Sequence, residues 1–242
     1  MIVPCYNEEF RFPLAYWREV IEKTDAIWFF VDDGSTDGTL NILNKLASPK
    51  VYTVSITVNS GKSEAIRKGF LEALQRTELK ISTIGYLDCD GAFNLEDIRY
   101  FLELAKTEEI YSMLWSSRVC LAGSQIERSN LRHYIGRVIS TYLWAGTPSK
   151  IYDTQSGFKI FRFKGFLPTL LAEEFKTKWF VDLEMYIRWL TFESHSSVVR
   201  EIPVKHWKEV GGSKVRVSSA LSILKEMYGI RRGLRKGLKN GS

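Results

Sequence analysis

The sequence predicts an α/β fold with a Rossmann-like, mainly parallel central sheet flanked by helices. The first 117 residues alternate short apolar runs with helical patterns, which is typical of βαβ units. The run Ile27-Trp28-Phe29-Phe30-Val31 is continuously apolar, as expected of a parallel strand buried on both faces. With 242 residues and 45% apolar content, the chain can bury the core of one such domain.

The alternation sets the order of the elements in the first half. Apolar runs predict strands at 1–4, 27–32, 51–57, 82–88 and 111–117. Helical spacing predicts helices at 11–23, 36–47, 62–76 and 95–106. Ser35 or Thr36 is expected to cap the second of these helices, and Asn94 the fourth. Ligands of such sheets bind beyond the carboxyl ends of the strands, so the residues that follow each strand are the expected site.

The second half has a different pattern, but no linker rich in Pro, Gly or Ser precedes it, so one domain over residues 1–242 is expected. Its expected elements are a basic, aromatic helix at 128–146, a strand at 158–161, a helix at 182–192 and a strand at 198–204.

The last stretch, 218–239, predicts a basic amphipathic helix. It carries four apolar residues at helical spacing among Lys and Arg residues: Leu221, Leu224, Met227 and Tyr228. Such a helix either lies on an anionic membrane surface or packs against the core with a solvated tail. Three glycines weaken it as a helix, namely Gly229, Gly233 and Gly237.

Composition narrows the class of protein. The net charge of +6 suits an anionic partner: a nucleotide, a lipid phosphate, a membrane surface or nucleic acid. Cys5, Cys89 and Cys120 are too scattered for a disulfide framework or a thiolate zinc site, which favours a reducing compartment. The three histidines show no metal-site spacing. The sequence has no run of about 18 uncharged apolar residues, so it predicts no transmembrane helix.

Carboxylates follow two of the expected strands. Asp32-Asp33-Gly34 begins the segment after the second strand, and Asp88-Cys89-Asp90 follows the fourth. Taken singly, each is either a capped turn or a ligand site. Two carboxylates separated by one residue can bind one hard cation, and Mg²⁺ or Mn²⁺ takes one or two protein carboxylates plus substrate phosphates.

A glycine-containing turn and an arginine group are candidates for binding anions. Asn59-Ser60-Gly61-Lys62-Ser63 is not a P-loop, because the required earlier glycine is Ile56. Lys62 and the following helix N-terminus either face an anion or form a simple capped turn. The arginines near the aromatic helix either bind phosphate or form a solvated face: Arg118, Arg128, Arg132 and Arg137.

Together these motifs resemble the inverting family 2 glycosyltransferases of the GT-A fold, specifically the dolichyl- and polyprenyl-phosphate hexosyltransferases, which include mannosyl and glucosyl members. The resemblance covers nearly the whole chain. Its landmarks, in order, are VPCYNEE (3–9), DDGSTDGT (32–39), NSGKSEAIRKG (59–69), DCDG (88–91), SSR (116–118), DTQSGFKIF (153–161), WFVDLE (179–184) and KEVGGSK (208–214).

The resemblance implies a role for each matching residue. Base and ribose of the donor would contact Pro4, Tyr6, Glu8 and Asp33, and the same donor site would include Val31, Lys62 and Cys89. Asp88 would face the nucleotide sugar and share with Asp90 the divalent metal, Mg²⁺ or Mn²⁺. Some relatives supply a further metal contact from a glutamine where this chain has Ala92. Lys208 and Lys214 would close over the diphosphate. The acceptor phosphate would be bound by Arg118 and Arg132, in an acceptor site that also includes Arg128, Asp153, Gln155 and Ser156.

By this resemblance, residues 1–117 bind the nucleotide sugar, 118–217 bind the acceptor, and 218–242 form the C-terminal helix and tail. The DTQSGFK segment favours UDP-glucose over GDP-mannose as donor. A lipid phosphate is largely a dianion at neutral pH, so no strong general base is required. A divalent cation and Lys or Arg would stabilise the leaving nucleoside diphosphate. We expect a peripheral protein on the cytoplasmic face of a membrane, with a separate membrane-anchoring subunit as one option.

Two alternatives stay open at this point. A soluble saccharide acceptor would require a general base among Asp153, Asp182 and Glu184. A non-enzymatic basic protein for nucleic acid is the least favoured hypothesis, because it leaves the acidic strand ends without a purpose, and no nucleic-acid partner is expected.

Overall fold

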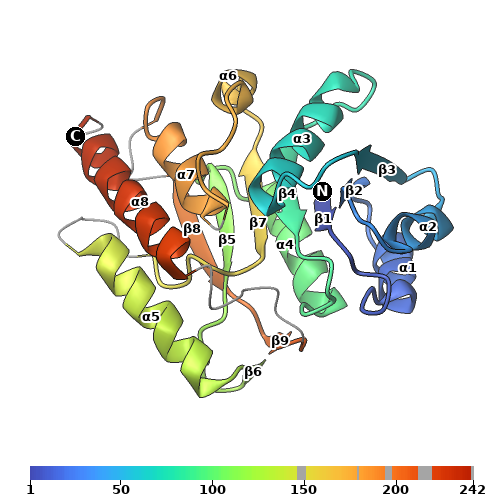
Figure 1. The fold of residues 1–242 in the computed structure, drawn as a ribbon, viewed down its shortest axis with the longest axis horizontal. Helices are drawn as coiled ribbons and strands as arrows, with labels where there is room; N and C mark the ends of the chain where they lie inside the picture. The colour runs from blue at the N-terminus through green and yellow to red at the C-terminus, as the bar shows by residue number, and fades with distance from the viewer. Residues whose placement is uncertain (146–150, 179, 194–197, 212–219, 241–242) are drawn as a thin grey trace.

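The fold is described from a computed structural model, which describes residues 1–145, 151–178, 180–193, 198–211 and 220–240. Within these residues, a seven-stranded sheet has the order β3-β2-β1-β4-β7-β5-β8 (Figure 1). Its strands are β1 (Ile2–Cys5), β2 (Trp28–Asp33), β3 (Val51–Ile56), β4 (Thr83–Leu87), β5 (Met113–Ser117), β7 (Phe158–Arg162) and β8 (Val199–Pro203). All neighbours are parallel except β7, which is antiparallel to β4 and β5. The predicted mainly parallel sheet is confirmed.

The helices lie where the apolar spacing predicts them, with small shifts at their ends. They are α1 (Leu14–Lys23), α2 (Thr39–Leu43) with the 3₁₀ turn η1 (Asn44–Leu46), α3 (Lys62–Gln75), α4 (Leu95–Thr107), α5 (Asn130–Trp144), α7 (Val181–Trp189) and α8 (Ala220–Asn240). Sequence reasoning missed α6 (Leu167–Leu171) and a small parallel sheet of β6 (Gln125–Glu127) and β9 (His206–Lys208). Elements of three to five residues are too short to show periodicity.

One predicted helix cap is confirmed and the other is wrong. The Asn94 side chain accepts a hydrogen bond from the backbone N–H of Asp97 at the start of α4. Helix α2 begins only at Thr39, after Gly38, so neither Ser35 nor Thr36 caps it. The reason is that residues 34–37 form a loop that is bonded to the segment after β1 rather than a first helical turn.

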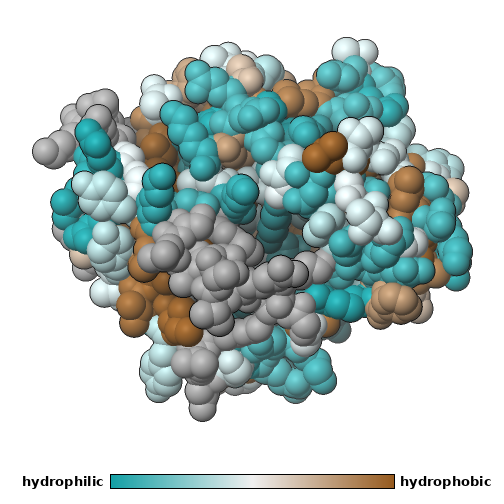
Figure 2. All heavy atoms as spheres, in the orientation of Figure 1, coloured by the Kyte–Doolittle hydropathy of each residue, from teal (hydrophilic) through white to brown (hydrophobic). Residues whose placement is uncertain are grey.

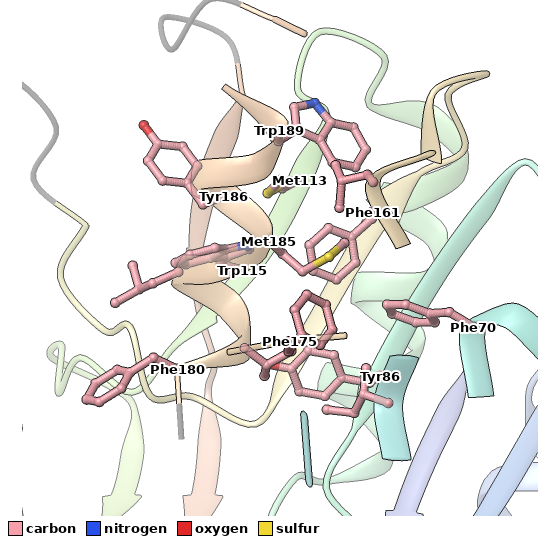
Figure 3. Packing of buried hydrophobic residues seen from close by; sticks show 14 of the residues in the cluster. Phe70, Tyr86, Met113, Trp115, Phe161, Phe175, Phe180, Met185, Tyr186 and Trp189 are labelled. Atoms are coloured by element: carbon pink, nitrogen blue, oxygen red, sulfur yellow. The ribbon is translucent and has the colours of Figure 1, made fainter. Parts of the chain in front are cut away.

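The sheet is covered on both faces, as the apolar run in β2 predicts. Successive side chains of a strand point to opposite faces. Trp28 and Phe30 accordingly pack in the cluster that includes α1 and α4, whereas Phe29 and Val31 pack in the cluster that includes α3 and α7. Figure 3 shows α7 side chains pointing toward Trp115 and Phe161 of the sheet. Full burial of each large apolar side chain contributes roughly 1.5–3 kcal/mol, so this two-sided core gives the strand ends a rigid support.

The C-terminal helix packs on the domain. Met227, Ile230 and Leu234 of α8 are buried, and α8 contacts α5 and α7 (Figure 1). Leu224 and Tyr228 of the predicted apolar stripe are exposed, Met227 is buried, and the side chain of Leu221 lies outside the described part. The core-packing alternative therefore holds for one face of this helix, and contact of its exposed residues with a membrane stays a prediction. Among the described residues, no helix is both long and apolar enough to cross a membrane.

Candidate active site

The site is built on the carboxyl ends of β1, β2 and β4. Strand β1 lies between the other two in the sheet, so the segments that follow the three strands meet at one edge, as predicted. The turn before α3 and the turn that precedes β7 also reach this edge.

The segment after β1 is bonded to the loop after β2. Asn7 donates its backbone N–H to Ser35 Oγ (2.9 Å), and Asn7 Oδ1 accepts from the backbone N–H of Thr36 (2.8 Å). The backbone N–H of Glu8 donates to Thr39 Oγ1 (2.7 Å). Asn7 has a φ of 49°, a left-handed conformation that asparagine tolerates better than most residues. These bonds fix the backbone around Tyr6 and Glu8, which the resemblance assigns to the donor.

Asp33 holds the turn before α3. One carboxylate oxygen accepts from the backbone N–H (2.9 Å) and hydroxyl (2.7 Å) of Ser60, and the other accepts from the N–H of Gly61 (2.7 Å) and from Asn59 Nδ2 (3.0 Å). Gly34 follows with a φ of +68°, and a Cβ there would lie 2.5 Å from the backbone nitrogen of Asn59. Asp33 is 2% exposed, so its described partners are this turn, and donor contact by its side chain stays a prediction.

The acidic pair after β4 faces Lys62. Asp88 Oδ1 lies 2.6 Å from Lys62 Nζ, and Asp90 Oδ1 accepts from the backbone N–H of Ala92 (3.1 Å). Burial, and then the nearby charge of Asp88, raise the pKa of Asp90 to about 6. Burial opposes the charge on Lys62, but Asp88 outweighs it and raises the pKa of Lys62. The site therefore combines a partly desolvated carboxylate with a firmly charged lysine.

Two carboxylates, those of Asp88 and Asp90, are the protein groups that could bind a hard divalent cation here. No group of three or more His, Cys, Asp or Glu side chains with metal-site geometry is found in the described part of the chain. Mg²⁺ and Mn²⁺ accept such a site when substrate phosphates complete the coordination. Burial and the charge of Asp88 raise the pKa of Asp90 although Lys62 and Arg11 act in the opposite direction, so a bound divalent cation would further favour its charged form. Asp88 and Asp90 are thus the residues that would hold it.

Arg118 is fixed by Asp153 in a buried bidentate pair. Arg118 Nε and Nη2 lie 2.7 and 2.8 Å from the two carboxylate oxygens, and the Arg118 backbone N–H also donates to Asp153 (2.9 Å). Burial would raise the pKa of Asp153, but Arg118 holds it well below its ordinary value. The guanidinium also lies over the Trp207 ring, 5.0 Å from its centroid. Arg118 is therefore a rigidly held cation. Asp153 is not available as a general base, because both of its carboxylate oxygens bind Arg118.

A second arginine lies close to this pair. Burial, and then the charge of Arg118, lower the pKa of Arg128, so the two guanidinium groups are within electrostatic reach. Arg137 instead donates to the Tyr152 carbonyl (3.2 Å) and stacks on the Tyr152 ring, which is a packing role. Arg132 belongs to α5, but its side chain lies outside the described part, so its predicted role stays a prediction.

The turn at 153–157 abuts the acidic pair. The backbone N–H of Asp88 donates to the Gly157 carbonyl (2.9 Å), and a Cβ on Gly157 would lie 2.0 Å from Asp88 Oδ2. Ser156 is 1% exposed, and its hydroxyl pairs with that of Ser116 (2.5 Å). Contact of the Ser156 side chain with an acceptor is therefore not supported. Gln155 is half-buried and bonds within the turn.

The structure also shows where the other residues of the predicted donor site lie. Val31 is fully buried and faces Gly69 of α3, so its side chain belongs to the core, and its predicted place in the donor site stays a prediction. Cys89 is buried, and its neighbour Cys5 and burial raise the pKa of its thiol, so the side chain packs in the core and its predicted place in the donor site stays a prediction. Pro4 lies in β1, paired with Val31. Lys208 is exposed and pairs with Glu127 at 3.3 Å, while Lys214 lies outside the described residues.

The sheet order and this site define a GT-A fold with an acidic pair at the end of β4. The chain belongs to glycosyl transferase family 2, whose family model matches residues 1–167. Similar curated proteins are dolichyl-phosphate beta-glucosyltransferases. That of Trichomonas vaginalis (ALG5A) is 28% identical over 95% of this chain and 72% of the relative, and that of Saccharomyces cerevisiae is 28% identical over 96% and 73%. The human protein is 29% identical over 96% and 74%.

Solved structures agree in fold. Glucosyl-3-phosphoglycerate synthase from Mycobacterium tuberculosis with phosphoglyceric acid superimposes with a TM-score of 0.62 at 16% identity, over 98% of this chain and 77% of that one. The same enzyme with Mn²⁺ and UDP-glucose gives 0.61 at 16% identity, over 96% and 74%. At this identity the likeness shows the fold alone.

Proposed function

We propose that this protein transfers glucose from UDP-glucose to a polyprenyl phosphate such as dolichyl phosphate, with inversion at the anomeric carbon. The observation that carries the proposal is the pairing of two sites along one sheet edge. One is the acidic pair with Lys62 after β4, and the other is Arg118, which follows β5 and is held by Asp153, with Arg128 as its predicted companion. The printed activity of the similar curated proteins, dolichyl-phosphate beta-glucosyl transfer, supports the same reaction and favours it over the mannosyl alternative.

A phosphate acceptor needs no general base, and the three candidate bases of this protein are all engaged in other contacts. A phosphomonoester dianion attacks without losing a proton to a base. Asp153 is bound to Arg118, and both oxygens of Glu184 accept from Lys176 and Thr177 backbone N–H groups or from Arg188. Asp182 is paired with Lys159. These three candidate bases are therefore committed to structural contacts, which argues against a hydroxyl acceptor on a soluble saccharide.

Divalent metal belongs to the same proposal. Asp88 and Asp90 would hold Mg²⁺ or Mn²⁺ with the donor diphosphate, and the ion would neutralise charge on the departing nucleoside diphosphate. Lys62 adds a cation beside Asp88. The basic residues Lys208 and Lys214 stay candidates for closing over the diphosphate.

Metal affinity should fall below pH 6. Protonation of Asp90, whose pKa is raised to about 6, removes one ligand charge, so apparent Mn²⁺ affinity should drop about tenfold per pH unit below that value. For the metal-free protein the sign is opposite: because this pKa is raised on folding, the Asp90 contribution to stability increases as the pH falls from about 6 toward 4. Mn²⁺ titrations in the presence of UDP between pH 5 and 8 measure the first effect. A flat affinity between pH 5 and 7 would contradict it.

The acceptor phosphate site is testable at Arg128. Arg128→Gln should raise the KM for dolichyl phosphate by about 10–100-fold, the value of one charge-assisted bond, and leave UDP binding unchanged. Arg128 is the sharper choice, since removing Arg118 would also leave the buried Asp153 unpaired. The matched control is Arg99→Gln on the exposed side of α4. Initial rates at varied lipid phosphate measure the effect, and an unchanged KM would refute this role.

A lipid acceptor requires contact with a membrane surface. Tyr134, Ile135 and Val138 of α5 are each at least half exposed, and Figure 2 shows apolar surface in the region of α5. Exposed cations of α8 lie on the neighbouring helix, among them Arg232 and Arg235. We propose that α5, more than the core-packed α8, contacts the lipid on the cytoplasmic face, either unaided or with a membrane-anchoring subunit.

One experiment tests the whole proposal. The protein is incubated with radiolabelled UDP-glucose or GDP-mannose, dolichyl phosphate and Mg²⁺ or Mn²⁺, and lipid and aqueous products are separated. Label in the lipid from UDP-glucose is the expected result. Label in a soluble glycan alone, or none in the lipid from either donor, would overturn it. A basic nucleic-acid-binding protein would instead bind oligonucleotides in a salt-dependent manner, whether or not Asp90 is replaced.

A further inference from the structure

Lys159 is buried, and its contacts converge on the turn beside the acidic pair. It lies on β7 with 0% exposure, an unusual place for an ammonium group. Its Nζ lies 2.8 Å from Asp182 Oδ2, and it donates to the carbonyls of Ser156 (2.7 Å) and Thr154 (3.2 Å). The three N–H bonds of the ammonium group therefore have three acceptors, two of them backbone carbonyls of one turn.

That turn carries two contacts of the site. At one end, Asp153 fixes Arg118 through both carboxylate oxygens. At the other end, the Gly157 carbonyl accepts from the Asp88 backbone N–H, and Gly157 leaves space for the Asp88 side chain that a Cβ would fill. A shift of the turn would therefore move both the acidic pair and the arginine that faces the acceptor.

Asp182 of α7 pairs with the lysine. It lies at the start of α7, is 4% exposed, and its second oxygen, Oδ1, has no hydrogen-bond partner among the described residues. A Cβ on Gly61 would lie 3.9 Å from Lys178 Cγ, so the segment before α7 borders the turn that carries Lys62. The pair thus lies within the site region rather than in a remote part of the core. Burying two charges is costly, and such a pair is weak support for stability by itself.

We propose that Lys159, held by Asp182, is a positioning residue for glucosyl transfer: it fixes the 153–157 turn and thereby places Asp88 and Arg118. The inference rests on the proposed function. It assigns no contact with substrate to Lys159, and the bonds to Thr154 and Ser156 carbonyls are the ones that matter. A purely structural ion pair would lack this link to the turn.

The test separates positioning from stability with a replacement pair. Lys159→Met and Asp182→Leu are each expected to lower the melting temperature, because each leaves a buried ionisable group without its partner. The double variant K159M/D182L replaces the pair by apolar side chains and should recover much of that loss. We expect its kcat to stay at least tenfold below wild type, and its Mn²⁺ affinity in the presence of UDP, measured by electron paramagnetic resonance, to be reduced.

The outcomes are distinguishable. A double variant with recovered melting temperature and wild-type kcat and Mn²⁺ affinity would overturn the proposal. Lys159→Gln, which reaches fewer of the three acceptors, is expected to lower kcat and Mn²⁺ affinity and keeps the test open if Lys159→Met does not fold; wild-type values in folded Lys159→Gln would also count against it. If wild-type protein transfers no glucose, the proposed function fails, while the Mn²⁺ measurement still reports whether Lys159 positions Asp88.

Discussion

Replacing Asp90 with asparagine is expected to lower kcat/KM for glucosyl transfer by about 10²–10³-fold, because it removes a charge that would hold the cation stabilising the leaving diphosphate. The side chain keeps its size and its acceptor for the Ala92 N–H, so the fold should persist. Burial and Asp88 raise the pKa of this carboxyl, so neutralising it relieves electrostatic cost in the metal-free protein. We therefore expect the variant without metal to be at least as stable as wild type.

Transfer rates and melting temperatures with and without Mn²⁺ check both parts. Mn²⁺ with UDP should raise the melting temperature of wild type much more than that of Asp90→Asn. Asp25→Asn, a change at an exposed aspartate after α1, is the matched control and should retain activity. Full activity in Asp90→Asn would remove this residue from the proposed metal site.

The site could be located from sequence because parallel strands share one edge. The carboxylates that end β2 and those that follow β4 belong to strands that flank β1, so their convergence needs only the strand order. The partners of Asp33 were not predictable in the same way. They belong to the turn at 59–61, whose backbone N–H groups point at Asp33 only once α3 is packed on the sheet.

Errors in the sequence reasoning have local physical causes. The cap of α2 was misplaced because Ser35 and Thr36 are good caps, yet tertiary bonds from Asn7 use them in a loop. The sequence offered Asp182 as a candidate general base rather than as the partner of a lysine, and Lys159 in an apolar strand gives no sign of three buried acceptors. Their pairing depends on the contact between α7 and β7, which sequence spacing does not reveal.

Short elements escaped prediction for a different reason. Strands β6 and β9 have three residues each and pair with each other across the second half, where the sequence has no regular alternation. Helix α8 shows the reverse case: its apolar spacing was evident, but spacing alone does not say what covers it. In the structure α8 contacts α5 and α7 and buries Met227 together with Ile230 and Leu234, whereas Leu224 and Tyr228 of the predicted stripe stay exposed.

Gly157→Ala is expected to reduce transfer about 10²-fold while leaving the protein folded. The added Cβ would lie 2.0 Å from Asp88 Oδ2 and 2.3 Å from Asp88 Cγ, so the carboxylate or the turn must move. A displacement of about 1 Å at a positioned group can cost that much in rate. Asp88 also pairs with Lys62, so the lysine should shift with the carboxylate. If the two residues act on the donor diphosphate as proposed, Mn²⁺ affinity in the presence of UDP should fall together with kcat.

Gly165→Ala is the matched control for Gly157→Ala, since a Cβ at Gly165 would meet nothing within 4 Å. It should leave both transfer and Mn²⁺ affinity near wild type. If Gly157→Ala retained both, the Asp88 side chain would have to be free to leave its contact with the turn without loss. That result would separate the acidic pair from the 153–157 turn and weaken the argument for Lys159. A joint loss of rate and metal affinity would instead tie the two together through Gly157.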